Sequence, residues 1–332
     1  EIGYGDKKQY SEMRCSRGYL SSSEAAVHFG LGAEKKVDLV RIVWPDGRIQ
    51  ELKDQKTNRT LTLHYQEAKN SEIPKAAPAE LFTDRTEKIS PEFRHTENVF
   101  DDYKKQILLP HRLSRLGPKI STGDLNGDKR EDFFVGGARN QPGAIYLQDS
   151  EGGFTQKPQA AFSADRIFED MGSAIFDADG DGDLDLYVVS GGSEVSEGAG
   201  YQDRLYLNDG NGNFTRSKSI PSTSSSGSVV AVTDFDGDGD LDLFRGGRLV
   251  PDQYPFAPRS FLFENTGKGN FKDVTESRAS ELKNPGMVTT ACWLDLDGDK
   301  KEELLLAGEW MPIQVFKWEG SELKKQDAQK WG

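Results

Sequence analysis

The chain has 332 residues, and its 55 acidic side chains outnumber its 42 Lys and Arg side chains, for a net charge of −13. This balance argues against a nucleic-acid ligand, because the sequence has no Lys/Arg-rich stretch that could neutralise phosphates. It also has no apolar run near the eighteen residues of a membrane-spanning helix, so we expect no membrane span.

Residues 1–66 are predicted to form a small all-β domain. Two β-rich runs, 37–44 and 48–52, flank a Pro-Asp-Gly turn, and residues 60–65 alternate in polarity like a further strand. Residues 67–80 contain Asn, Ser, two prolines and several alanines, a composition typical of a linker.

This first domain resembles the ASPIC/UnbV family between about residues 10 and 66. The words that carry the resemblance are Gly18-Tyr19-Leu20-Ser21, His28-Phe29-Gly30-Leu31-Gly32 and the run from Val37 through Trp44-Pro45-Asp46-Gly47 to Leu52. The family is known to accompany calcium-loop repeats, but the resemblance implies no defined chemistry for the domain itself.

Four aspartate-rich nonapeptides follow, beginning at residues 124, 177, 234 and 295. Each places oxygen-bearing side chains at positions one, three, five and nine, with glycine at position four. Ca²⁺ fits this pattern because it takes six to eight oxygen ligands from alternate residues of a tightly turning loop. Position seven varies in chemistry, so we expect its backbone carbonyl to be the ligand. The predicted metal-binding residues are Asp124, Asn126, Asp128, Arg130 and Asp132 in the first loop, Asp177, Asp179, Asp181, Asp183 and Asp185 in the second, Asp234, Asp236, Asp238, Asp240 and Asp242 in the third, and Asp295, Asp297, Asp299, Lys301 and Glu303 in the fourth.

Acidic, solvated turns are the alternative interpretation, since Asp and Gly are common in turns. Four copies in one register favour metal loops, and we expect up to four Ca²⁺ ions, one per loop, whose binding is coupled to folding. An EF-hand is excluded because it needs a twelve-residue loop between helices, whereas each loop here leads into a β-prone run.

The loops belong to a longer repeating module, because they begin 53, 57 and 61 residues apart. In the second copy we predict four strands, at residues 173–176, 184–190, 204–207 and 214–215, with an Asn/Asp/Gly turn before the last. Four short strands per module are typical of a β-propeller blade. We therefore predict an all-β fold in which residues 81–332 form a partial β-propeller.

The propeller region resembles the FG-GAP or VCBS repeat family, the calcium-loop propellers related to integrin α-subunit heads. The resemblance rests on the loops, on a following Gly-Gly (136–137, 191–192, 246–247) and on a hairpin that ends Gly-x-Phe. It covers roughly residues 80 to 332. The fourth unit departs from it, with Glu303 at position nine and Ala307-Gly308 in place of Gly-Gly.

We expect the propeller to be incomplete. Six or seven blades at this spacing would need about 350 to 400 residues, more than the chain provides. It offers four loops and a partial unit at residues 81–84, and we expect it to be a piece of a longer protein.

No catalytic motif is present: the sequence has no G-x-S-x-G, H-E-x-x-H, C-x-x-C or phosphate-binding loop. We expect His28 and His64 to have structural roles. His95 and His111 lie in the loop-rich stretch 90–118 and could act as acid or base, although nothing pairs with them in sequence.

Two further features carry less information. Tyr254, Phe256 and Trp310 could form a stacking surface for a sugar ring or a partner, or could pack onto their own blades. The two cysteines lie in different predicted domains, and Cys292, beside Trp293, is predicted to be a buried hydrophobe rather than half of a disulfide.

The sequence therefore predicts a calcium-binding, non-catalytic binding or scaffold module of an exported bacterial repeat protein. Calcium loops fill where calcium is plentiful, which favours the periplasm, the cell surface or secretion. The expected partner is a protein or a glycan held by the propeller loops. The alternative is a lyase-type, polysaccharide-active enzyme, which would need a Lys, Arg, His or Tyr base beside a groove.

Overall fold

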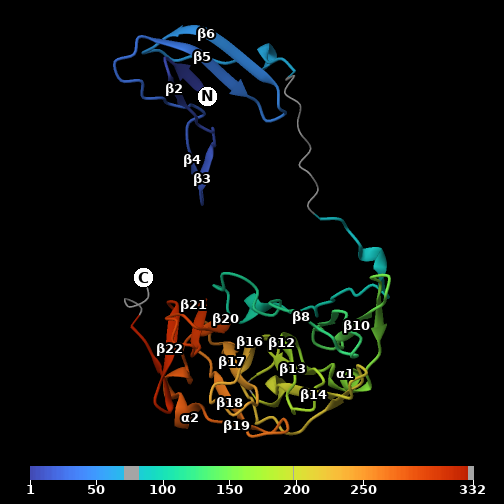
Figure 1. Cartoon of the computed structure of the whole chain (residues 1–332). Coiled ribbons are helices and arrows are strands. Elements are labelled where there is room, and N and C mark those ends of the chain that lie inside the picture. Colours follow the sequence, from blue (N-terminus) through green and yellow to red (C-terminus); the bar gives the residue numbers. More distant parts are fainter. Residues whose placement is uncertain (71–81, 197, 328–332) are drawn as a thin grey trace. The chain divides into compact units, whose positions relative to one another are not determined.

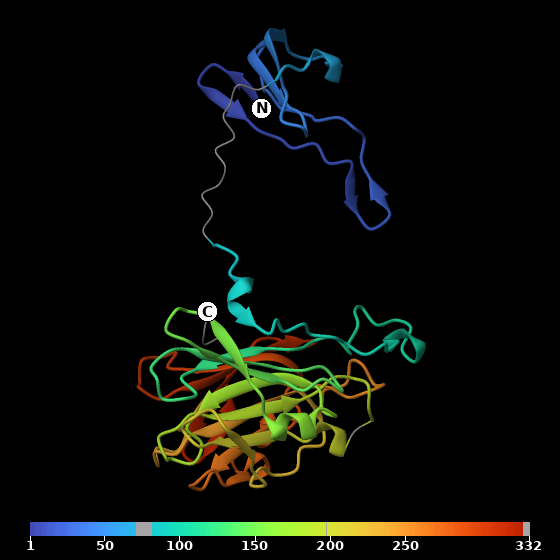
Figure 2. The same cartoon turned by 90° about the vertical axis from the view of Figure 1, so that its right-hand side faces the viewer.

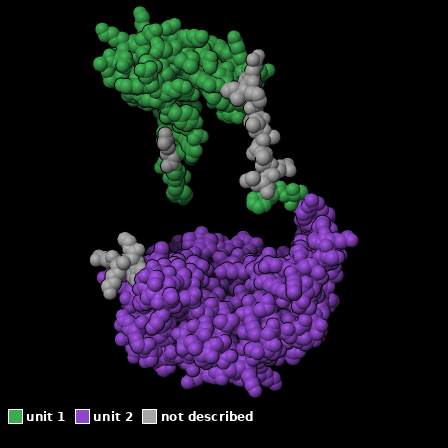
Figure 3. All heavy atoms as spheres, in the orientation of Figure 1, with its two compact units in different colours: residues 1–83 green, residues 84–332 purple. Residues whose placement is uncertain are grey.

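The computed structural model of the protein describes residues 1–70, 82–196 and 198–327 (Figure 1). The chain divides into two compact units, residues 1–83 and 84–332 (Figure 3). Most of the predicted linker, 67–80, falls on residues 71–81 and so lies outside the described residues. Both units are built from β-strands, which confirms the predicted all-β class.

The first unit contains a four-stranded antiparallel sheet of order β2-β1-β5-β6 and a separate hairpin of β3 and β4. Ile2, Tyr4 and Val37 form its small core. The elements described in this unit are β1 (Ile2–Tyr4), β2 (Lys7–Gln9), β3 (Ser16–Gly18), β4 (Ser21–Ser22), β5 (Lys36–Val43), β6 (Ile49–Lys56) and the 3-10 helix η1 (Tyr65–Glu67).

Within this unit one predicted hairpin is confirmed and one predicted strand is wrong. β5 and β6 pair around the Pro-Asp-Gly turn, as predicted. Residues 60–64 form no strand, and η1 follows them. The reason is that Tyr65 packs edge-on against Trp44, with ring centroids 5.3 Å apart, and its hydroxyl donates to Asp46. These contacts hold the chain over the hairpin turn instead of along a sheet edge.

The second unit consists of four sheets, one for each repeat, which we number as blades one to four (Figure 1). In each blade four consecutive strands pair as an antiparallel meander, the strand order of a propeller blade. Their bounds are β8 (Ile120–Gly123), β9 (Asp132–Val135), β10 (Ala144–Gln148) and β11 (Phe154–Lys157) in blade one, β12 (Asp170–Phe176), β13 (Asp185–Ser190), β14 (Arg204–Asn208) and β15 (Phe214–Arg216) in blade two, β16 (Ser226–Thr233), β17 (Asp242–Leu249), β18 (Phe261–Asn265) and β19 (Phe271–Asp273) in blade three, and β20 (Met287–Leu294), β21 (Glu303–Glu309), β22 (Gln314–Glu319) and β23 (Glu322–Lys325) in blade four.

Short helical turns join these strands. They are η2 (Thr86–Lys88), η3 (Asp102–Lys104), α1 (Ala160–Asp165), η4 (Ala199–Tyr201), α2 (Thr275–Arg278) and η5 (Ser280–Leu282). Apart from η3, residues 91–118 are irregular and run along one side of the second unit (Figure 2).

The predicted partial unit at residues 81–84 is not found among the described residues. Residues 82–84 form no strand, and Phe82 is exposed. An extra strand, β7 (Ile89–Ser90), instead joins blade one by pairing parallel to β11. Phe82 and Asp84 have the same spacing as Phe271 and Asp273 in the last strand of blade three. Among the described residues, however, no partner strand covers Phe82.

The first strands of successive blades pack beside one another, β8 with β12, β12 with β16 and β16 with β20. The Gly-Gly pairs make this close approach possible. A Cβ on Gly191 would lie 2.3 Å from the Gly227 carbonyl oxygen, and one on Gly136 would lie 2.7 Å from the Asp170 Cβ. A Cβ on Gly246 would meet the side chains of the neighbouring first strands in the same way. Only glycine leaves room for the next blade at these points.

Apolar side chains fill the space between blades. Between the first two blades the aromatic residues Phe134, Phe162, Tyr206 and Phe214 are buried, and each contributes about 1.5–3 kcal/mol by its burial. A fully buried ion pair joins blade three to blade two, where the Arg245 Nε lies 2.9 Å from an Asp203 carboxylate oxygen. Each pair of neighbouring blades is therefore joined by a buried apolar cluster of its own.

The prediction that Cys292 is buried is wrong. Cys292 is exposed, as is Thr290 on the same face of β20. The opposite face of β20 packs on blade three, whereas no blade of the described chain covers the face that carries Cys292.

Candidate metal centres

Each predicted metal loop connects the first strand of its blade to the second. The glycine at position four has a φ of +76° in the first loop and +78° in the other three, a conformation that glycine adopts without strain. The four turns therefore have one geometry, as the repeated spacing predicted.

The carboxylate of the first aspartate accepts hydrogen bonds from backbone N–H groups of its own loop, so the loop curls around it. In the second loop Asp177 accepts hydrogen bonds from the backbone N–H groups of Gly180 at 2.8 Å and Gly182 at 3.0 Å. The third loop repeats this with Asp234, and the fourth with Asp295. These bonds hold the loop in a shape that aims further oxygen atoms inward.

The ninth residue is a structural anchor, a role that the sequence did not reveal. It is at most 1% exposed in all four loops. In the second loop Asp185 accepts from the N–H of Ala178 within the loop, at 2.9 Å, and from the N–H of Asn208 on the third strand, at 2.8 Å. Asp242 makes the equivalent two bonds in the third loop. One carboxylate therefore ties the loop to the third strand of its blade.

The structure brings three carboxylates together in the second and third loops. We call Asp177, Asp179 and Asp185 the second-loop triad, and Asp234, Asp236 and Asp242 the third-loop triad. One oxygen from each member lies within 4.8 Å of the others. Such a set of hard oxygen donors fits a divalent cation.

The electrostatics of the two triads agree with this fit. Burial, followed by the negative charge of neighbouring aspartates in the loop, raises the pKa of Asp185 to about 6 and that of Asp242 to about 7. These carboxylates therefore need a cation or a proton to balance their charge in the folded protein.

Positions five and seven lie outside the triads. Asp181 accepts from the N–H of Asp183 at 2.9 Å, and Asp238 from the N–H of Asp240. The side chain of Asp183 points toward the hairpin of its own blade, because a Cβ on Gly210 would lie 2.4 Å from its Oδ2. The role of position seven as a backbone ligand remains a prediction.

The first loop differs from the second-loop and third-loop triads, because two of its own side chains bind the carboxylate of Asp128. The Arg130 guanidinium contacts Asp128 Oδ2, and the Asn126 amide donates to the same oxygen at 2.9 Å. Arg130 also donates from Nε to the Gln148 carbonyl at 3.0 Å. Asp124, at position one, and Asp132, at position nine, keep the backbone bonds seen in the other loops.

In the fourth loop Asp295, Asp297 and Asp299 come together, and Glu303 lies fully buried beneath them. A lysine from the third strand, Lys317, reaches into this loop. Lys301, at position seven, is exposed.

Asn208 and Asn265 connect neighbouring loops, a role that the sequence analysis missed. The Asn208 amide donates to the carbonyls of Leu125 in the first loop, at 2.9 Å, and Leu184 in the second, at 3.0 Å. Asn265 links the second and third loops through Ala178 and Leu241. The sequence does contain an asparagine at the end of the third strand in two repeats. Only the fold shows that the side chain of this asparagine reaches the loop of the preceding blade.

Comparison with known families gives a match in each unit. Residues 1–70 match the family described as ASPIC and UnbV. Residues 124–188 and 189–244 match the FG-GAP-like repeat. The chain joins an ASPIC and UnbV segment to FG-GAP-like repeats. No curated protein matched the chain.

The matched FG-GAP-like repeats contain the first three metal loops, and the fourth loop lies outside the matched stretches. Their fold is propeller-like, which agrees with the four blades. Among the described residues no helix has the length and apolar character needed to cross a membrane.

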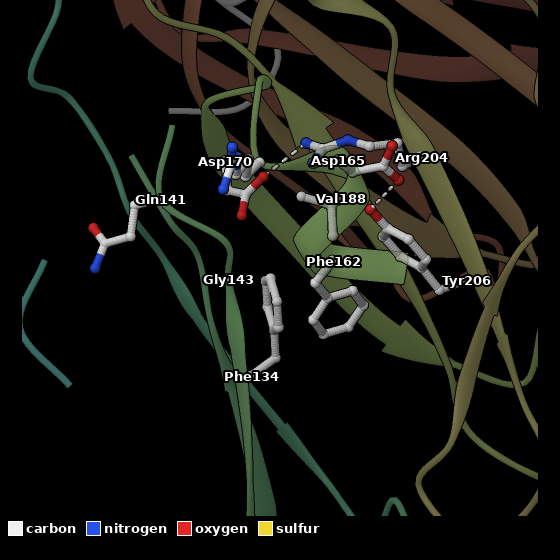
Figure 4. Close-up of a pocket in the computed structure, with 10 residues that line it drawn as sticks. Phe134, Gln141, Gly143, Phe162, Asp165, Asp170, Val188, Arg204 and Tyr206 are labelled. Carbon is white, nitrogen blue, oxygen red and sulfur yellow. Dashed lines mark hydrogen bonds and ion pairs between the residues drawn. The ribbon is translucent and has the colours of Figure 1, made fainter. Parts of the chain in front are cut away.

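A small cavity lies between the first two FG-GAP-like blades (Figure 4). Its volume is about 10 Å³, enough for one water molecule. Arg204 lies 2.8 Å from Asp170 at one side, and Tyr206 donates to Asp165 at 2.8 Å (Figure 4). The cavity is too small for a substrate, and its polar groups pair with one another, so it is part of the blade interface.

The two candidate acid–base histidines each meet a carboxylate in space. His95 Nε2 lies 2.9 Å from Glu97, and His111 Nε2 lies 3.2 Å from Glu309. Glu309 also pairs with Arg248 at 3.1 Å. His28 and His64 are exposed, and neither lies in a strand.

A larger groove runs beside residues 99–113. Its volume is about 430 Å³, within the range of small-molecule sites, and Lys105 and Asp252 are among the residues that line it. Nearby, the Trp310 indole donates to the Tyr254 hydroxyl at 2.6 Å. Trp310 is 74% exposed and Phe256 67%, so of the three aromatic residues only Tyr254 packs into the protein.

Proposed function

We propose that this chain is a calcium-stabilised, non-catalytic binding or scaffold module of an exported protein. FG-GAP-like repeats are typical of extracellular proteins, where calcium is abundant. The observation that carries the proposal is the geometry of the second-loop and third-loop triads, in which three carboxylate oxygens lie within 4.8 Å of one another.

Charge repulsion gives the proposal its energetic basis. Two like charges 4 Å apart repel by about 4 kcal/mol at the effective dielectric constant of a protein surface. A bound Ca²⁺ would supply the opposite charge and would draw positions one, three and nine together. Position nine is already bonded to the third strand, so the ion would also stiffen the link among three strands of its blade.

The partner proposed for the module is a protein or a glycan, contacted through the propeller loops. The exposed rings of Trp310 and Phe256 and the groove beside residues 99–113 offer a surface of suitable chemistry. Aromatic rings of this kind bind sugar rings or protein anchors through their apolar faces.

Thermal unfolding in EDTA and in millimolar calcium tests the proposal. Calcium is expected to raise the melting temperature of the wild-type chain, and the double variant D179N/D236N is expected to lose most of that rise. D209N is the matched control, because Asp209 lies in an exposed hairpin of the same region and belongs to neither triad. Equal melting temperatures in EDTA and in calcium would rule the proposal out.

A second candidate, a polysaccharide lyase, has one observation in its favour. His111, Glu309 and Arg248 form a charged cluster next to the exposed Trp310. Ultraviolet absorbance during incubation with pectin-like and other acidic polysaccharides would detect the unsaturated products of a lyase. Activity that disappears in H111A would establish this candidate in place of a purely binding role.

A further inference from the structure

The fourth loop contains a cation of its own. The Lys317 ammonium lies within hydrogen-bond distance of Asp297 Oδ2, 2.7 Å from Asp299 Oδ2 and 3.0 Å from Glu303 Oε1. These carboxylates belong to positions three, five and nine, which are three of the four side-chain positions predicted to bind metal. Lys317 therefore donates hydrogen bonds to Asp297 and Asp299 and forms an ion pair with Glu303.

The corresponding residues of the other blades carry no positive charge. The register across the second and third strands identifies them, because Leu304 pairs with Phe316 in blade four as Leu186 pairs with Tyr206 in blade two. The residues equivalent to Lys317 are Leu147 in blade one, Leu207 in blade two and Glu264 in blade three.

In the third loop an arginine balances the negative charge of the carboxylates only in part. Arg278 lies 2.9 Å from Glu264 and 3.3 Å from Asp236, so its guanidinium touches one member of the third-loop triad from outside. Lys317, in contrast, contacts three different carboxylates of its loop. A calcium ion that used those carboxylates would have to displace the ammonium or lie beside it, and two positive charges that close repel strongly.

We infer that Lys317 is the resident cation of the fourth loop and that this loop takes no calcium in the wild-type protein. The inference removes the fourth loop from the proposed calcium sites. It rests on the proposed function in one respect, because it contrasts this loop with neighbouring loops that bind calcium. Blade four then keeps its loop closed whether or not calcium is present, while blades two and three depend on the ion.

Calcium stoichiometry in the full chain tests the inference. Metal bound after equilibrium dialysis against millimolar calcium is measured for the wild type, K317M, D297N and D297N/K317M. K317M is expected to bind one more ion per chain than the wild type. D297N is expected to bind the same number as the wild type, and the double variant should return to that number.

K324M is the matched control. Lys324 pairs with Lys317 across β22 and β23, but its ammonium contacts Glu322 and none of the loop carboxylates. K324M should leave the stoichiometry unchanged, so a gain seen only in K317M cannot come from a general loss of positive charge. A loss of one ion in D297N, or no gain in K317M, would overturn the inference.

Unfolding in EDTA separates this inference from the proposed function. Without calcium, K317M leaves four carboxylates of the fourth loop uncompensated, so its melting temperature should fall further below that of the wild type than the melting temperature of K324M does. If the wild type binds no calcium at all, the proposed function fails, and the EDTA comparison still decides the role of Lys317. Should K317M not fold, an unchanged stoichiometry in D297N supports the inference and a reduced one refutes it, provided that the wild type binds calcium.

Discussion

The second and fourth loops share aspartate at positions one, three and five and glycine at position four, but the surrounding blade treats their charges differently. In blade two the residue across the hairpin is Leu207, and the second-loop triad faces no side-chain cation among the described contacts. In blade four the equivalent residue is Lys317, whose ammonium bridges three carboxylates. If calcium fills the second loop as proposed, the residue that decides metal dependence lies on the third strand, outside the loop motif itself.

Removing calcium should produce the largest difference between these two loops. At a free calcium concentration one hundred times the dissociation constant, each occupied loop adds about 2.7 kcal/mol to the free energy of unfolding, or about 5 kcal/mol for the second and third loops together. D179N should abolish about half of the calcium-dependent stabilisation, and D297N should leave it intact. Urea unfolding with and without EDTA measures both, and equal losses in the two variants would break the comparison.

Outside the loops, the carboxylate of Glu169 is buried beside other acidic side chains, and the nearby charge of Arg139 offsets them only in part. Glu169 is 4% exposed, and its Oε1 has no hydrogen-bond partner among the described residues. Burial, followed by the negative charges of Glu97 and Glu194, raises the pKa of Glu169 to about 8. In the folded protein Glu169 therefore keeps its proton to a higher pH than in the unfolded chain.

The sign of the resulting pH dependence follows from this raised pKa. Glu169 stabilises the fold fully below its unfolded pKa, and that stability is lost as the pH rises through about 8. Between the unfolded and the folded pKa, each unit of pH increase lowers the free energy of unfolding by up to about 1.4 kcal/mol. E169Q should match the wild type near pH 4 and exceed it at pH 8 in urea unfolding. The exposed control E92Q should follow the wild type, and an E169Q curve parallel to it would contradict the prediction.

The asparagine bridges sharpen the comparison between neighbouring loops. Asn265 joins the second loop to the third, whereas blade four has Trp318 at the equivalent position. Asn265→Ala should lower the free energy of unfolding by about 1–3 kcal/mol, because it leaves buried carbonyl groups without a donor. Asn270→Ala, in the exposed part of the same hairpin, should cost much less. Chemical unfolding in calcium measures both.

The smallest effect is expected at Lys301, one of the two lysines within the fourth loop itself. Lys301 occupies position seven within the motif, yet its side chain is exposed. Lys301→Ala should change the free energy of unfolding by no more than about 0.5 kcal/mol. A fall as large as that of K317M in EDTA would show that the fourth loop responds to total charge rather than to the placement of Lys317.

The sequence predicted those features that depend on neighbouring residues. The turn glycines, the four strands per module and the hairpin around Pro-Asp-Gly are local, and all are confirmed. The metal ligands remain a prediction, although the structure gathers the second-loop and third-loop triads. Features that depend on distant contacts were missed, because the register across a hairpin places Lys317 and Asn208 beside loops that lie far away in the sequence.

The wrong predictions have the same origin. Residues 60–65 alternate like a strand, but Tyr65 finds Trp44 and the turn before β6 instead of a sheet edge. Cys292 sits in a β-rich run, yet burial there depends on whether another blade covers that face of β20. Periodicity in sequence reports which face could be buried and cannot report what covers it.

The glycines at which one blade meets the next have a consequence for how such proteins change in length. Each of the first three blades has a notch at its second strand, at Gly136, Gly191 or Gly246, into which the first strand of the next blade fits. Both halves of that joint are encoded within a single repeat. Duplication of one repeat would therefore add a blade that already matches its neighbours, so the number of blades can grow or shrink by recombination without the invention of a new interface.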